Sequence, residues 1–122
     1  MGSFGQGGIM SMDRDREHEA KARKHAKELG LEWDVVVDHT NICNFIRSIV
    51  LHWLCIHQDR LSDWNFWDDM DTLQGESMQN KIHLFIEMGY PLPKEISDHP
   101  NLFNDFYVTI LHILDLFERP TF

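Results

Sequence analysis

The sequence lacks long apolar runs that would span a membrane, and it has few cysteines to form disulfide cross-links. Polar side chains such as Asn44 and His52 interrupt every apolar stretch within about ten residues, whereas a bilayer-spanning helix needs roughly 20. Only two cysteines are present, Cys43 and Cys55, which are too few for a disulfide framework. These absences predict a protein of a reducing compartment, and we expect a cytoplasmic location.

Glycine is scarce beyond the first eight residues, which contain four of the seven glycines. A segment so rich in glycine gains too little from packing to offset the entropy lost on ordering. We therefore expect residues 1–12 to be a disordered leader or a cloning scar, and residues 13–122 to form a single α-helical domain. The chain of 122 residues is long enough to bury one hydrophobic core.

Basic side chains are rare outside the N-terminal part of the chain. The net charge is −9, and 15 acidic but only 5 basic residues lie outside residues 13–28. This balance argues against direct binding to nucleic acid or to an anionic membrane, because such binding relies on lysine and arginine. We expect the partner to be a basic protein, such as a nucleic-acid-processing enzyme or a toxin, because opposite charges steer association. Homodimer formation is left open.

Apolar side chains recur at helical spacing along most of the chain, and no hairpin pattern competes with them. The pattern predicts an all-α fold: a single-domain bundle of four to five helices with short loops. A loop or a first helical turn is expected at residues 31–37. Expected helices cover about residues 13–29, 38–61, 62–74, 76–88 and 99–118. The expected core contains Ile46, Ile49, Trp53, Phe85, Ile110 and Leu114.

The most unusual segment runs from Ser62 to Glu76 and mixes aromatic with acidic side chains. It contains five acidic residues and no basic one. Aromatic anchors surrounded by a charged rim are typical of protein–protein interfaces. Alternatively, the rings cover the core and the carboxylates are solvated. The residues expected to contact a partner are Asp63, Trp64, Phe66, Trp67, Asp68, Asp69, Asp71 and Glu76.

A second motif is the hexapeptide from Arg47 to His52, which resembles the Arg-x4-His motif of the HEPN ribonucleases. That family is also all-α and of similar length. The resemblance implies an RNA-cleaving site in which Arg47 and His52 act on the phosphate and the ribose hydroxyl. Ser48 follows the arginine here, where the family usually has Asn, Asp or His.

The eight histidines raise the question of a metal site. The Glu-x-x-His motif of helical di-iron proteins is absent, and no nucleotide-binding loop or Ser/His/Asp set is recognisable. We therefore expect neither a cofactor nor a metal. We expect the histidines to lie half-exposed on helix faces. Four pairs nevertheless have helical ligand spacing: His39 with Cys43, His52 with Cys55, His83 with Glu87, and His112 with Asp115.

The small size, the acidic charge, the predicted all-α fold and the lack of a recognisable catalytic set favour a binding role over catalysis. In size and charge it is similar to immunity proteins, antitoxins and phage anti-defence inhibitors such as anti-CRISPR proteins. We expect a non-enzymatic inhibitor that docks on a basic protein surface. The alternatives are a HEPN-like ribonuclease that uses Arg47 and His52, and a helical protein that binds a metal or a small ligand.

Overall fold

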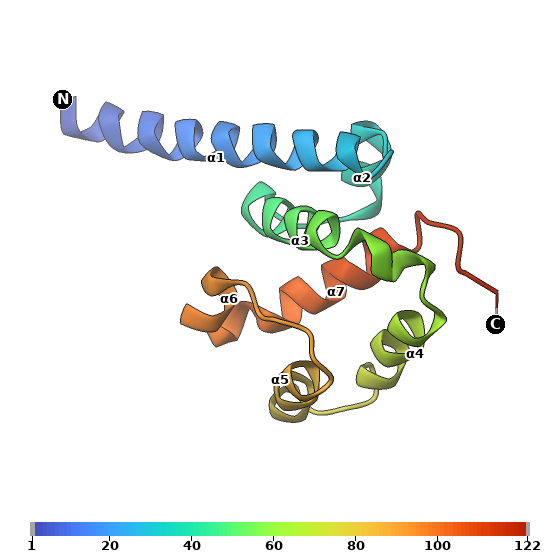
Figure 1. The fold of residues 1–122 in the computed structure, drawn as a ribbon. Coiled ribbons are helices and arrows are strands. Elements are labelled where there is room, and N and C mark those ends of the chain that lie inside the picture. The colour runs from blue at the N-terminus through green and yellow to red at the C-terminus, as the bar shows by residue number, and fades with distance from the viewer. Residues whose placement is uncertain (1, 122) are drawn as a thin grey trace.

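The computed structural model describes the backbone of residues 2–121 and the side chains of residues 14–121 (Figure 1). Over this range the chain is all-α, as predicted, with seven α-helices and no strand. The expected number of four to five helices is wrong. The α-helices are α1 (Gly2–Glu28), α2 (Trp33–His39), α3 (Asn44–Ile56), α4 (Trp64–Leu73), α5 (Met78–Glu87), α6 (Lys94–Asp98) and α7 (Phe103–Leu114). The 3-10 helices are η1 (Gln58–Ser62) and η2 (Pro100–Leu102).

Helix α2 accounts for one additional helix, because it occupies a segment for which the sequence predicts a loop or a first helical turn. Its consecutive valines are poor helix formers, since β-branched side chains lose rotamer freedom in a helix. Burial of Val36 in the core compensates for this weakness. The tertiary packing of one residue therefore overrides the local propensity.

The predicted 38–61 helix is interrupted at its N-terminal end by the turn between α2 and α3. Arg47 holds this turn: its guanidinium donates hydrogen bonds to the Thr40 hydroxyl and the Thr40 carbonyl, each at 2.9 Å. It also donates to the side-chain carbonyl of Asn44 at 2.6 Å. The Thr40 hydroxyl in turn donates to the Val36 carbonyl at 2.9 Å, which satisfies the last turn of α2.

The predicted 99–118 helix is also divided. Pro100 restricts the backbone of His99 away from the helical region, and His99 has φ −132° and ψ 74°. Residues before it form α6, and those after it form η2 and then α7. The two glycines with positive φ, Gly30 and Gly89, follow α1 and α5, where left-handed backbone ends a helix.

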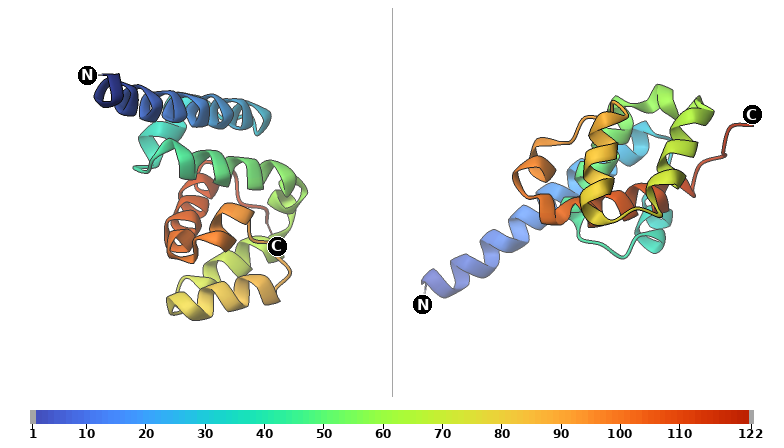
Figure 2. Two further views of the ribbon diagram at one scale, coloured as in Figure 1. Left: turned by 90° about the vertical axis from the view of Figure 1, so that its left-hand side faces the viewer. Right: turned by 90° about the horizontal axis from the view of Figure 1, so that it is seen from below.

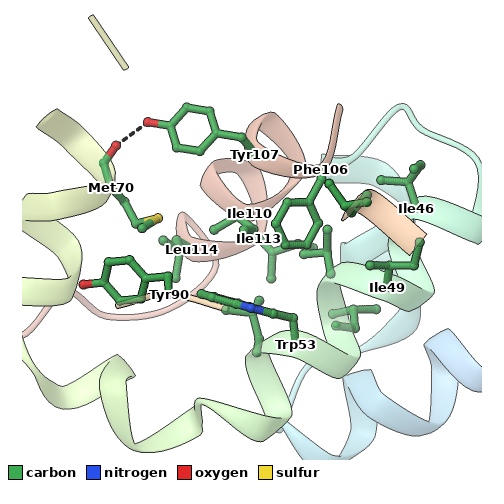
Figure 3. Close-up of a cluster of buried hydrophobic side chains, with 14 of the residues drawn as sticks. Ile46, Ile49, Trp53, Met70, Tyr90, Phe106, Tyr107, Ile110, Ile113 and Leu114 are labelled. Carbon is green, nitrogen blue, oxygen red and sulfur yellow. Dashed lines mark hydrogen bonds between the residues drawn. The ribbon is translucent and has the colours of Figure 1, made fainter. Parts of the chain in front are cut away.

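The core lies between α3, α4, α5 and α7, with α1 along the outer side of α3 (Figure 1). All six residues expected in the core are buried in one apolar cluster, which confirms that prediction. Trp53 lies among aromatic side chains that include Tyr90 and Phe106 (Figure 3). Its indole N–H donates to the Pro91 carbonyl at 2.9 Å. Four rings have centroids between 5.7 and 6.3 Å from that of Trp53: Phe66, Phe85, Tyr90 and Phe106.

Helix α1 packs on α3, and its N-terminal half projects beyond the other helices (Figure 2). Ala22 and Ala26 are its buried apolar residues, and the buried Leu29 directly follows its last residue. The helix begins at Gly2, earlier than the expected start near residue 13, and the side chains of residues 1–13 lie outside those described. No helix in the described part of the chain combines the length and the apolar character needed to cross a bilayer.

Deleting residues 1–10 is expected to leave the melting temperature unchanged. The side-chain contacts of α1 with α3 begin at Asp15, which accepts a hydrogen bond from Asn44 at 3.2 Å, and continue through His18 and His25. Thermal unfolding followed by circular dichroism would compare the full and shortened chains, with Ala26→Asp as a control that disrupts the contact of α1 with α3. If the melting temperature of the shortened chain fell as much as that of Ala26→Asp, the leader would be docked on the rest of the protein.

Candidate functional site

Helix α4 divides the aromatic and acidic segment into two faces. Asp63 caps the helix, because its carboxylate accepts a hydrogen bond from the Asn65 backbone N–H at 3.0 Å. Asp68 and Asp71 lie on the outer, exposed face. The inner face is buried and consists of Phe66, Trp67, Met70 and Leu73.

Two of the three predicted aromatic anchors belong to the core and not to the surface. Phe66 is 1% exposed and packs against Trp53 and Tyr90, with ring centroids 6.0 and 5.7 Å away. Trp67 is 7% exposed, and its indole N–H donates to the Leu61 carbonyl at 2.9 Å. Trp64 is half-buried. A partner that approaches this segment therefore meets carboxylates and one partly accessible indole.

Some of the predicted carboxylates have structural contacts of their own. Asp69 accepts a hydrogen bond from the Tyr90 hydroxyl at 2.5 Å, and burial together with this carboxylate raises the pKa of Tyr90 well above its ordinary value. Glu76 accepts from the Asn80 side chain at 3.4 Å. Asp68 is exposed on the outer face, which makes it the clearest candidate for contact with a partner.

A hollow of about 520 Å³ lies beside α4, between this helix and α7. Its lining includes the rings of Trp67 and Tyr107 and the carboxylates of Asp71 and Asp115. The Arg119 guanidinium forms an ion pair with Asp71 and lies 5.6 Å from the centroid of the Trp67 ring. An aromatic surface beside a carboxylate is the environment in which a guanidinium binds well.

Tyr107 positions the wall of this hollow. Its hydroxyl donates to the Met70 carbonyl, which ties α7 to α4 (Figure 3). Burial, together with the negative charge of Asp71, raises the pKa of Tyr107 to about 12. The phenol therefore stays protonated at neutral pH and remains a hydrogen-bond donor. The Lys81 ammonium lies 5.2 Å from the centroid of the same ring.

The structure separates the two residues of the HEPN-like motif. Arg47 has its guanidinium occupied by Thr40 and Asn44 in the turn before α3. His52 instead faces α1, with its ring centroid 4.7 Å from that of His25. His52 lines a hollow in which Arg47 takes no part. The geometry gives no support to joint action of Arg47 and His52 on one phosphodiester.

That second hollow, of about 700 Å³, lies between α1, α3 and the segment before α6. Its apolar side includes Ile49 and Trp53. This hollow was not predicted from the sequence, although the spacing of His18, Lys21 and His25 places all three on one face of a helix. The ionisable residues that line it are His18, Lys21, Lys24, His25, His52, His57, Lys94 and Glu95.

Of the four histidine pairs noted in the sequence, His83 and Glu87 are in contact: His83 Nε2 lies 3.1 Å from Glu87 Oε2 on the exposed side of α5. His39, which the spacing pairs with Cys43, instead has its Nε2 3.9 Å from Asp115 Oδ2, and this contact links α2 to the end of α7. Within residues 14–121, one group of three donors lies close enough to share a metal ion: His25, Glu28 and Cys55, whose donor atoms are all within 4.8 Å of one another.

The protonation of this group follows from its surroundings. Burial, together with the adjacent Glu28 carboxylate, raises the pKa of the Cys55 thiol to about 11. Burial acts to raise the pKa of Glu28, but the adjacent His25 and Cys55 side chains and the positive charge of Lys24 outweigh it, so the Glu28 pKa is lowered. The group therefore contains a carboxylate and a neutral thiol at neutral pH.

No protein-family model, no curated protein and no solved structure matches this chain.

Proposed function

We propose that the protein is a non-enzymatic binding module that docks on a basic protein surface through the outer face of α4 and the adjoining α4–α7 hollow. The observation that carries this proposal is that the hollow already binds a guanidinium, that of Arg119, between the Asp71 carboxylate and the Trp67 ring. A surface with this chemistry suits an arginine or lysine side chain of a partner.

The use of the chain's own cations supports the proposal. Only five basic residues lie outside residues 13–28, and most of them are engaged within the protein. Arg60 lies 4.8 Å from the centroid of the Tyr90 ring, Lys81 lies over Tyr107, and Arg47 is used in the turn before α3. The exposed carboxylates are therefore left to generate a negative field, which accelerates encounter with a basic partner.

We further propose that the partner is a nucleic-acid-processing enzyme or a toxin, and that the module inhibits it in the cytoplasm. Carboxylates along α4 would then occupy the surface on which the enzyme binds phosphates. In size and charge the chain is similar to immunity proteins, antitoxins and anti-CRISPR proteins, and we propose an irregular helical bundle as the scaffold for this role. The α4 face needs no catalytic group for such a role.

Binding is expected to depend on the outer face of α4. A photo-crosslinking amino acid placed at Trp64 should capture a basic protein from cells, whereas the same group placed at Asp34 on α2 should not. With the captured protein in hand, Asp68→Asn should slow association and flatten its dependence on salt, because screening at 0.15 M ionic strength acts beyond about 8 Å. Association rates measured at several salt concentrations would report both effects.

The matched control is Asp34→Asn, which removes the same charge from an exposed position of α2. Asp69 and Asp71 are unsuitable for the first test, since their carboxylates contact Tyr90 and Arg119. Equal effects of the two substitutions would mean that net charge, and not α4, matters. A partner captured only from Asp34, or binding insensitive to salt, would contradict the proposal.

A further inference from the structure

We propose that His25, Glu28 and Cys55 form a binding site for a zinc-class divalent cation at the contact between α1 and α3. His25 and Glu28 lie three residues apart in the last turns of α1, so both side chains point to the same side of the helix. Cys55 faces them from the end of α3. The three donor atoms come from two helices and lie within 4.8 Å of one another.

The separations are close to those of a tetrahedral site. With Zn–N and Zn–O bonds of about 2.0–2.1 Å and Zn–S of about 2.3 Å, neighbouring ligand atoms lie about 3.3–3.6 Å apart. His25 Nδ1 and Glu28 Oε2 are 3.5 Å apart, which already fits. The Cys55 sulfur is brought in by a small side-chain rotation, since the whole group spans no more than 4.8 Å.

A second observation on His25 points to a ligand. Its Nδ1 atom is buried yet has no hydrogen-bond partner, although buried polar atoms in proteins are nearly always paired. The nitrogen is directed at the Glu28 carboxylate without a hydrogen bond to it. A cation between the two atoms would satisfy both of them. The half-exposed Glu28 side chain leaves a route for the ion to enter.

The donor set selects the class of ion. Imidazole nitrogen, thiolate sulfur and carboxylate oxygen together suit Zn²⁺, whereas Mg²⁺ and Ca²⁺ prefer oxygen alone. The Cys55 thiol now donates weakly to the His25 carbonyl at 3.4 Å. On binding, Cys55 loses its proton to solvent and the sulfur turns to the ion, while a water molecule takes the fourth position. The ion would fasten α1 to α3 beside the contact of the His25 and His52 rings.

The proposal is tested by titrating the purified chain, first stripped of metal, with Zn²⁺ and with Co²⁺. Co²⁺ should produce the near-ultraviolet charge-transfer band of a cobalt–thiolate bond, and Zn²⁺ should displace it. Cys55→Ser should abolish the band, and Glu28→Gln should weaken Zn²⁺ binding by more than about tenfold. Zn²⁺ should also raise the melting temperature of the original chain and not that of Glu28→Gln.

Two control variants separate this site from other metal-binding side chains. Cys43→Ser removes the exposed cysteine, and His83→Ala removes an exposed histidine that pairs with Glu87; both should leave the band unchanged. The proposal fails if no cobalt–thiolate band forms, or if the band persists in Cys55→Ser. It also fails if Glu28→Gln, an exposed substitution that should fold, binds Zn²⁺ as tightly as the original chain.

Discussion

Replacing Trp53 with alanine is expected to lower the free energy of unfolding by about 3–5 kcal/mol, the usual cost of removing a large buried ring. Trp53 is 3% exposed and is surrounded by the rings of Phe66, Phe85, Tyr90 and Phe106. The substitution also leaves the Pro91 carbonyl without the indole donor. Chemical denaturation followed by circular dichroism would measure the loss.

Ile56→Ala provides the matched control, because Ile56 lies on the same helix but is 60% exposed. Its effect on stability should stay within about 0.5 kcal/mol. If Trp53→Ala and Ile56→Ala destabilised the protein equally, α3 would not be the centre of the core. Because Trp53 and Ile56 lie on the same helix, the expected difference in their effects on stability follows from the difference in burial.

Arg47→Ala is expected to lower the free energy of unfolding by about 1–3 kcal/mol, because it leaves buried acceptors without a donor. The guanidinium is the partner of the Thr40 carbonyl and hydroxyl, and Thr40 is 1% exposed. Arg47→Lys should recover only part of the loss, since an ammonium group lacks the planar fork of donors. Thermal and chemical denaturation of the original chain, Arg47→Ala and Arg47→Lys would rank their stabilities.

Arg23→Ala is the control for this prediction, because Arg23 forms an exposed ion pair with Glu19 and such pairs contribute only about 0–1 kcal/mol. An Arg47→Ala chain with unchanged stability would contradict the structural role of Arg47. If the original chain cleaved RNA and an Arg47→Ala chain of unchanged stability did not, that result would support the HEPN resemblance.

Elements whose boundaries depend on local signals were predicted well from the sequence. Helix α5 begins after Ser77, whose hydroxyl accepts a hydrogen bond from the Asn80 N–H, and Gly89 follows its end at φ +94°. The helix predicted for residues 62–74 exists, but it begins at Trp64 after the Asp63 cap, because residues up to Ser62 form η1.

Features that depend on long-range contacts were not predicted. The turn before α3 exists because Arg47 reaches back seven residues to Thr40, and no periodicity encodes that contact. The core role of Phe66 and Trp67 was noted only as an alternative, since an aromatic residue among carboxylates suits both a core and an interface. His25 and Cys55 are thirty residues apart, so their proximity follows only from the packing of α1 on α3.

The contact of Arg119 with Asp71 and Trp67 has a consequence for the strength of partner binding. A side chain tethered to its own site is present there at a high effective concentration, because only a short linker separates Arg119 from the end of α7. Under the proposed function, an incoming basic residue of the partner would have to displace this internal competitor, and the apparent affinity would fall in proportion to the fraction of molecules in which the site is vacant. The C-terminal segment would thereby favour a partner surface with several basic side chains over a single basic side chain, because Arg119 must first be displaced.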